Sequence, residues 1–259
     1  MKTGTAPDAS LPTFSHRRFR WFTRYLRAFY LRRQFTALRL APKGLSARNE
    51  PRPTIVYTNH PSWWDPLVFM LVHGALFPGR PMYGPFDEKA LEKYGFFRRL
   101  GAFGVDLESR AGAVKFLRTS RQILAQPESV LWITAQGRFA DVRERPLQLR
   151  PGLAHAARAA ADVDVIPVAV EYTQWDERLP EILVRVGEGI DLRGEGTPDY
   201  EQHLANTMDA LAADAVARDP ERFDVLLDGR VGVGGMYDRW RRVKSWARGR
   251  AFDPAHGER

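Results

Sequence analysis

The sequence of 259 residues contains no cysteine. Disulfide bonds, thiolate nucleophiles and cysteine-based zinc or iron–sulfur sites are therefore excluded. Long hydrophobic runs are also missing, because the longest nearly apolar stretch, 66–77, is well short of the ~20 residues that a transmembrane helix requires. The opening MKTGTAPDASLPTFS lacks the apolar region of a signal peptide. We therefore expect a chain that does not cross a bilayer, although it could lie on one.

The histidines of the sequence also lack the spacing of metal ligands. His73, His155 and His203 are scattered along the chain, so we expect no metal site and no bound cofactor. The glycines of GRVGVGG (229–235) lack the strand and helix that surround a nucleotide-binding loop.

The charge balance is strongly basic. The chain has 39 Lys and Arg against 31 Asp and Glu, which gives a formal net charge of +8 and a pI near 10.0. This surplus favours anionic partners, namely nucleic acid, anionic lipid headgroups or phosphorylated substrates. Arginine greatly outnumbers lysine, which suits bidentate contact with phosphate or carboxylate, although a GC-rich genome produces the same bias.

Residues 14–40 contain eight arginines and no acidic residue. At helical spacing, one face carries Arg17, Arg20, Arg24 and Arg27, and another carries Phe19, Phe22, Leu26 and Phe29. This pattern predicts a basic amphipathic helix that docks on an anionic membrane surface. The alternative is a helix packed on the core with a solvated arginine face. The basic and aromatic stretch 237–252 could form a second patch facing the same surface.

Strand and helix patterns alternate through the rest of the chain. Apolar, β-branched runs predict strands at 54–60, 129–137, 164–172 and 181–190, with shorter strands within 79–90 and 100–109. Helical periodicity or composition predicts helices from 61 onward and over 87–94, 111–126, 150–162 and 199–218. The alternation indicates an α/β fold with a mixed, largely parallel central sheet flanked by helices. We divide the chain into a flexible tail (1–13), the amphipathic helix (14–45), a main domain (46–228) and a basic C-terminal segment (229–259).

The candidate site lies in IVYTNHPSWWDPLVF, residues 55–69. Two residues five apart on one helix point ~140° from each other, so His60 and Asp65 could not meet on a continuous helix. Pro61 favours the first helical position, which would leave His60 at the cap and let its imidazole fold back to Asp65. The carboxylate would fix the tautomer of the ring, and the helix start would favour a developing anion.

This pair predicts a general base. The chain has no G-x-S-x-G motif and no thiol, so half of a nucleophilic triad is the weaker interpretation. Ser62 follows the histidine too closely to be a good nucleophile. The structural alternative is a plain strand–helix junction capped by Asn59 or Ser62.

NHPSWWDPL resembles the N-H-x-x-x-x-D signature of the glycerolipid (lysophospholipid and 1-acylglycerol-phosphate) acyltransferase family. Later blocks follow in that family's order, and the resemblance spans about 51–190. They are GAFGVD (101–106), WITAQGRF (132–139), LRPGLAHAA (149–157) and VIPVAV (165–170).

The resemblance implies that His60 deprotonates an acceptor hydroxyl, which attacks an acyl thioester on CoA or acyl carrier protein, while Asp65 orients His60. It also implies that the third block, here Gln136, Gly137 and Arg138, binds the acceptor. This block departs from the family pattern, since Gln136 replaces a glutamate, Ala135 replaces a proline and the arginine follows the glycine directly. The acceptor could be a lysophospholipid, lysophosphatidate, a glycosylated lipid or another membrane alcohol.

Four further residues are candidate contacts. Trp63 and Trp64 would shape an apolar channel for the acyl chain, or belong to the core. Arg98 and Arg99 would contact the phosphates of CoA, or lie in a solvated loop.

We therefore expect a peripheral membrane O-acyltransferase at the cytoplasmic face, with an anionic membrane surface, a lipid acceptor and an acyl-CoA or acyl carrier protein donor as partners, and no nucleic acid. One alternative is a catalytically altered lipid-binding relative of the fold. Another is a basic nucleic-acid-binding protein, which lacks support because no nucleic-acid fold pattern is visible.

Overall fold

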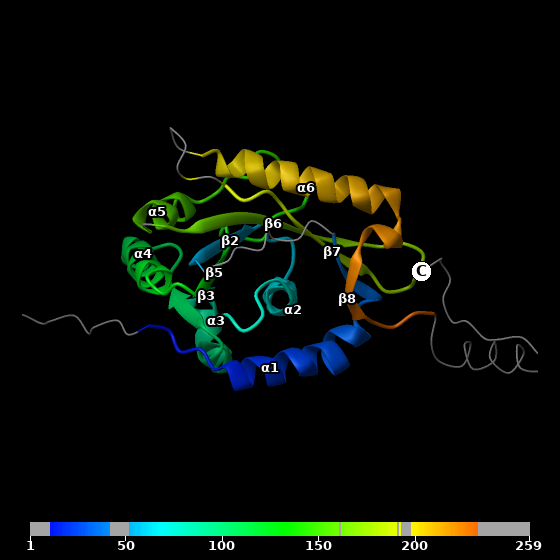
Figure 1. Cartoon of the computed structure of the whole chain (residues 1–259), viewed down its shortest axis with the longest axis horizontal. Helices are drawn as coiled ribbons and strands as arrows, with labels where there is room; N and C mark the ends of the chain where they lie inside the picture. Colours follow the sequence, from blue (N-terminus) through cyan, green and yellow to red (C-terminus); the bar gives the residue numbers. More distant parts are fainter. Residues whose placement is uncertain (1–10, 42–51, 161, 191, 193–197, 233–259) are drawn as a thin grey trace, which may run out of the picture.

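The computed structural model describes residues 11–41, 52–160, 162–190, 192 and 198–232 (Figure 1). They contain an eight-stranded sheet with the order β4-β3-β5-β2-β6-β7-β1-β8. The strands are β1 (Ala37–Leu40), β2 (Thr54–Thr58), β3 (Met82–Asp87), β4 (Ala102–Val105), β5 (Val130–Thr134), β6 (Asp164–Thr173), β7 (Glu181–Val186) and β8 (Asp224–Asp228). Only the β6–β7 and β1–β8 pairs are antiparallel. The predicted mixed, largely parallel sheet is confirmed.

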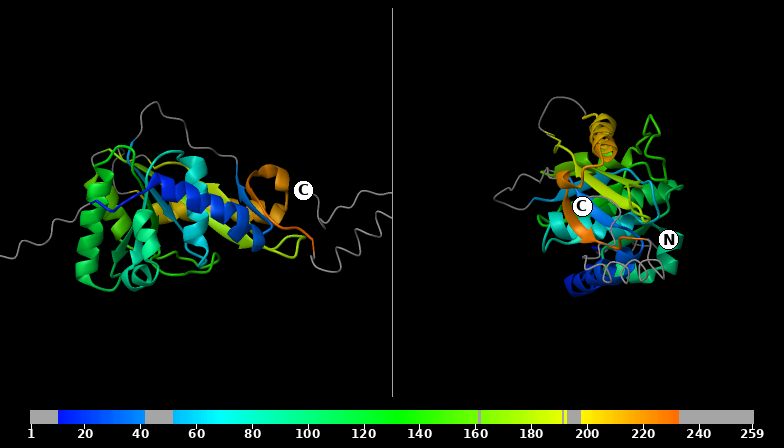
Figure 2. Two further views of the ribbon diagram at one scale, coloured as in Figure 1. Left: turned by 90° about the horizontal axis from the view of Figure 1, so that it is seen from below. Right: turned by 90° about the vertical axis from the view of Figure 1, so that its right-hand side faces the viewer.

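Helices cover both faces of the sheet. On one side lie α1 (His16–Tyr25) and α2 (Asp65–Leu76), and on the other lie α4 (Arg110–Leu124), α5 (Gly152–Ala159) and α6 (Tyr200–Ala217) (Figures 1 and 2). The short α3 (Glu88–Lys93) and the 3₁₀ turn η3 (Gly95–Arg99) connect β3 to β4, and the 3₁₀ turn η4 (Pro220–Arg222) connects α6 to β8. Each face has its own cluster of buried apolar side chains, so the chain is a three-layer α/β structure.

Helix α2 lies between the sheet and α1, and Figure 1 shows it nearly end-on while α1 runs lengthwise beyond it. Its sequence DPLVFMLVHGAL has no polar face, which is typical of a helix covered on more than one side. Val68 and Val72 are fully buried, and the ring of Phe19 from α1 lies 5.6 Å from the ring of His73. The helix that carries Asp65 is therefore held by the core from two directions.

The predicted N-terminal helix is confirmed in its first part and wrong in its last. Helix α1 continues through a π-helical turn, η1 (Leu26–Tyr30), and a 3₁₀ turn, η2 (Leu31–Arg33). Residues 37–40, which we expected to lie in the same helical segment, form strand β1 between β7 and β8. Pairing on both edges, with Leu38 fully buried, outweighs the helical propensity of this sequence. The main domain therefore includes β1 and does not begin at residue 46. The basic stretch 237–252 lies outside the described residues.

His73 is a buried histidine in α2 with both ring nitrogens satisfied. Its Nε2 donates to the carbonyl oxygen of Arg80 at 3.0 Å, and its Nδ1 accepts from Trp132 Nε1 at 3.2 Å. A proton on Nδ1 would break the second bond. Burial, the largest cause, lowers the pKa of His73 to about 4.

This depressed pKa predicts a pH-dependent stability. Because the unfolded chain binds a proton near the ordinary histidine pKa of about 6.5 and the folded chain only near 4, the stabilisation from neutral His73 is present above pH 6.5 and is lost as the pH falls towards 4. Measured by urea unfolding, the free energy of unfolding should be about 2 kcal/mol lower at pH 5 than at pH 7 because of His73. A His73→Gln variant should lose this increment, whereas a variant of exposed His155 should keep it; equal pH dependence in both variants contradicts the assignment.

Candidate active site

His60 and Asp65 meet at the junction between β2 and α2. The His60 Nδ1 atom lies 2.7 Å from Asp65 Oδ2, and the Asp65 side chain is fully buried while 16% of the His60 side chain remains exposed. The predicted fold-back of the imidazole is confirmed. The role given to Pro61 is wrong, because α2 begins at Asp65 and residues 61–64 form a turn in which Asp65 N donates to Ser62 O at 3.2 Å.

The Asp65 carboxylate accepts hydrogen bonds on both oxygens. Besides His60, Oδ2 receives the backbone N–H of Ser62 at 3.1 Å, and Oδ1 receives the hydroxyl of Tyr172 at 2.6 Å. Burial and the nearby Asp65 charge raise the pKa of Tyr172 far above its ordinary value, so the phenol remains a donor. Three donors thus satisfy the hydrogen-bonding capacity of this buried carboxylate. The carboxylate in turn favours a proton on His60 Nδ1 and leaves Nε2 free to accept one from a substrate.

The loop after β5 holds the backbone of His60 from both sides. Gln136 Oε1 accepts the His60 N–H at 3.2 Å, and Ala140 N donates to the His60 carbonyl oxygen at 3.0 Å. The other end of the Gln136 amide donates to Leu147 O at 3.3 Å, and the side chain is buried. The observed contacts of Gln136 are thus with the protein, and acceptor binding by this residue stays a prediction.

Gly137 and Arg138 continue this loop. Gly137 has a φ of 64°, and a Cβ on it would lie 2.5 Å from Nε of Arg150, so a side chain there would displace that arginine. Arg138 is exposed and forms an ion pair with Glu144, with Nη1 at 3.1 Å from Oε2. This pair holds the pKa of the Glu144 carboxyl below its usual range. An incoming acceptor phosphate would therefore compete with Glu144 for Arg138.

An aromatic side chain packs on the His60 ring. The ring of Phe139 lies over the imidazole with 4.4 Å between centroids, and Phe139 itself is 58% exposed. The two adjacent tryptophans differ, since Trp63 is 55% exposed whereas Trp64 packs against Phe35 at 5.2 Å between ring centroids. Trp64 thus joins the core, and Trp63 remains available at the surface beside the site.

Arg98 and Arg99 are not brought near the pair of His60 and Asp65, which we call the dyad. They are exposed and belong to η3, which leads into the amino end of β4. Strands β4, β3, β5 and β2 run parallel. The arginines therefore lie near the amino ends of these strands, whereas His60 follows the carboxyl end of β2. Contact with donor phosphates by Arg98 and Arg99 stays a prediction without support from this geometry.

A pocket of about 340 Å³ lies near the same strand ends on the α6 side, bordered in part by Asn59 and Tyr172. Its lining combines Arg143, Arg145 and Glu171 with apolar residues of α6. Burial raises the pKa of the Glu171 carboxyl. The pocket therefore places charged groups next to Asn59, the residue before His60.

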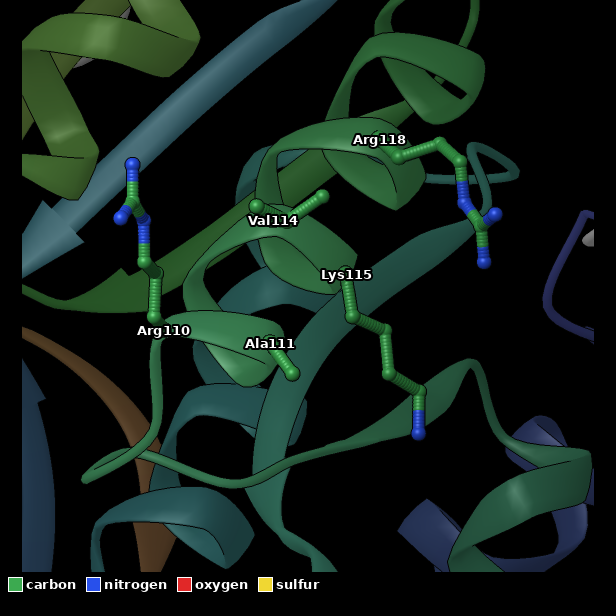
Figure 3. Close-up of a pocket in the computed structure, with 5 residues that line it drawn as sticks. All are labelled: Arg110, Ala111, Val114, Lys115 and Arg118. Atoms are coloured by element: carbon green, nitrogen blue, oxygen red, sulfur yellow. The ribbon is translucent and has the colours of Figure 1, made fainter.

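A hollow of about 500 Å³ on the outer face of α4 has a different character. Arg110, Lys115 and Arg118 surround the exposed Val114 there (Figure 3). Their side chains diverge, with Arg110 leaving the helix on the opposite side from the other two (Figure 3). This hollow contains no general base, and we do not assign it to catalysis.

Three residues of the site were missed in the sequence. Arg150 carried a signal, because it precedes the Pro-Gly start of α5. Phe139 ends the block WITAQGRF (132–139), to which the resemblance gives a role only through its Gln, Gly and Arg residues. Tyr172 carried no signal, because its partner Asp65 is 107 residues away and the two meet only when β6 lies beside β2.

Comparisons with known proteins place the chain among enzymes. A search of curated proteins found no match. Among solved structures, the 1-acyl-sn-glycerophosphate (LPA) acyltransferase of Thermotoga maritima is similar, with 15% sequence identity, a TM-score of 0.49, and coverage of 78% of this chain and 79% of that one. The sequence model of the Acyltransferase family matches residues 39–171, just over half of the chain. The chain thus belongs to the acyltransferase family.

Proposed function

We propose that this acyltransferase moves a fatty acyl group from acyl-CoA or acyl carrier protein to a hydroxyl of a lysophospholipid, lysophosphatidate or other lipid acceptor, with His60 as the general base. The observation that carries the proposal is the 2.7 Å contact between His60 Nδ1 and the buried Asp65 carboxylate. This contact leaves His60 Nε2, on a partly exposed ring, as the proton acceptor.

The reaction follows from this arrangement. The acceptor hydroxyl gives its proton to His60 Nε2 as its oxygen attacks the thioester carbonyl, and Asp65 stabilises the resulting imidazolium. When the tetrahedral intermediate collapses, the C–S bond breaks, the ester is complete and the proton passes from His60 to the leaving thiolate. No covalent acyl-enzyme is required, which agrees with a sequence without cysteine and with a Ser62 hydroxyl that accepts the N–H of Trp64.

Transfer of label tests the function. The protein is incubated with ¹⁴C-palmitoyl-CoA and total membrane lipid, and the lipid that gains the chain is identified by mass; a parallel arm uses palmitoyl-acyl carrier protein. Because the chain has no cysteine, released CoA can also be followed with a thiol reagent without background from the protein. Labelling of no lipid in either arm contradicts the proposal.

We also propose that the enzyme docks on the cytoplasmic face of an anionic membrane through α1 and η1. Trp21, Tyr25 and Phe29 form an exposed aromatic stripe at intervals of four residues, with successive ring centroids 6.2 Å apart. The arginines of the same segment from Arg17 to Arg33 are exposed as well. Aromatic rings beside arginines suit the headgroup region of a bilayer. No helix in the described parts of the chain is long and apolar enough to span one.

Charge removal on α1 tests the docking surface. We expect the double variant Arg20→Gln, Arg24→Gln to bind vesicles of phosphatidylcholine and 30% phosphatidylglycerol with a binding constant roughly 30-fold lower, measured by sedimentation. Each arginine near such a surface contributes about 1 kcal/mol. The matched control, Arg110→Gln with Arg118→Gln on α4, removes the same charge away from the aromatic stripe and should have a much smaller effect. Equal losses in both variants would show that binding follows net charge alone and would refute docking through α1.

A further inference from the structure

Tyr172 connects the dyad of His60 and Asp65 to strand β6. It lies near the end of β6, and its hydroxyl donates to Asp65 Oδ1 at 2.6 Å. The same carboxylate uses its other oxygen, Oδ2, for His60 Nδ1 at 2.7 Å. The three side chains therefore form a continuous Tyr–Asp–His chain of hydrogen bonds, with the imidazole as its partly exposed end.

The phenol is held in this position by its surroundings. Its ring packs against Phe35 with 5.8 Å between centroids, and its hydroxyl also interacts with the side chain of Ser62. Ser62 in turn receives the backbone N–H of Trp64 on its hydroxyl at 3.2 Å. The hydroxyl of Tyr172 is thus aimed at Asp65 by contacts from β6, the turn before α2 and the segment before β1.

We propose that Tyr172 is a positioning residue of the acyl-transfer reaction, which holds Asp65 so that Oδ2 stays on His60 Nδ1 and the ring presents Nε2 to the acceptor. The proposal rests on the function proposed above. A buried carboxylate oxygen without a donor is strongly disfavoured, so loss of the phenol would let the carboxylate turn about its Cβ–Cγ bond towards other donors. The N–H of Ser62 also faces Oδ2, but within the described residues Oδ1 has Tyr172 as its side-chain donor.

The phenol also affects the charge that the imidazole experiences. Its O–H dipole points its positive end at Asp65 and therefore offsets part of the negative potential at the ring. Without it, the carboxylate would stabilise imidazolium more strongly, and the base would be protonated up to a higher pH. This consequence separates a role through Asp65 from simple support of the fold.

Tyr172→Phe tests the proposal, because it keeps the ring against Phe35 and removes the hydroxyl. The donor is palmitoyl-CoA, and the acceptor is 1-oleoyl-lysophosphatidate or the lipid identified in the labelling experiment above. We expect kcat to fall roughly 10- to 100-fold. KM for both substrates should change by less than about two-fold, and the acidic limb of kcat/KM should move up by about half a pH unit or more. Tyr57→Phe is the matched control, since it removes a buried hydroxyl that donates to Tyr200 O at 3.1 Å on the other face of the sheet; it should leave kcat and the limb unchanged.

Two results would overturn the role of Tyr172. One is a kcat of Tyr172→Phe within two-fold of the wild type. The other is a loss of activity with an unmoved acidic limb, which would indicate damage to the fold. Failure of the proposed function is a separate outcome, because the wild-type protein itself would then transfer no acyl group to any lipid.

Discussion

Replacing His60 by alanine is expected to lower kcat for acyl transfer by about 10³-fold or more while leaving the fold intact. General-base catalysis contributes typically 10²- to 10⁴-fold, and His60 is the histidine paired with the buried carboxylate at 2.7 Å. Its backbone would still be held by Gln136 and Ala140, so circular dichroism and the melting temperature should change little. The loss should appear in kcat measured by thiol release from palmitoyl-CoA.

His155→Ala is the matched control, because His155 is an exposed histidine on α5, which packs on the other face of the sheet from α2. It should retain wild-type kcat. Free imidazole supplies a further test, since the space vacated beside Asp65 and Phe139 can admit it and should restore part of the activity of His60→Ala. If His60→Ala keeps more than about a tenth of the wild-type kcat, the general-base assignment is wrong.

Asp65→Asn should have an effect of similar size for a different reason. An amide at this position can still accept from Tyr172 on its oxygen, but its NH₂ group would then face His60 Nδ1. That nitrogen would have to accept, which moves the ring proton to Nε2 and removes the base from the side that meets the substrate. We expect a loss of about 10³- to 10⁴-fold in kcat, with KM for palmitoyl-CoA changed little.

The control for this change is Asp176→Asn, which alters an exposed aspartate paired with Arg218 at 2.9 Å and should leave kcat unchanged. The protonation pattern offers a second measurement, because ¹⁵N spectra of the His60 ring should report the proton on Nδ1 in the wild type and on Nε2 in Asp65→Asn. An Asp65→Asn variant that retains full kcat would show that the carboxylate does not orient the base.

Local patterns in the sequence predict the contact between His60 and Asp65 and most of the sheet. The β-branched run before His60 and the five-residue spacing to Asp65 lie within one short stretch, so the contact between them depends on a single turn. The turn was nevertheless predicted with the wrong start of the helix, because both Pro61 and Pro66 suit a first helical turn. Asp65 at the true start brings its carboxylate back to the N–H of Ser62, a detail that spacing does not contain.

Long-range pairing explains what the sequence did not reveal. The residues of β1 continue the basic, apolar pattern of α1, and only β7 and β8, more than 140 residues away, turn them into a strand. Arg39 shows the same effect. The sequence pattern predicts a surface arginine, but the side chain is buried and pairs with Glu181 at 2.7 Å. Tyr172 likewise acquires its partner only when β6 lies beside β2.

The insertion of β1 into the sheet has a consequence for the membrane docking proposed above. A membrane anchor joined through a free linker would let a catalytic domain turn in any direction above the bilayer. Here the aromatic stripe on α1 and η1 is followed within a few residues by a strand that is bonded on both edges, so the proposed docking surface and the His60–Asp65 pair belong to one rigid unit. In the proposed docking, the height and tilt of His60 above the headgroups would then be fixed, and the acceptors would be restricted to lipids whose hydroxyl lies at that depth.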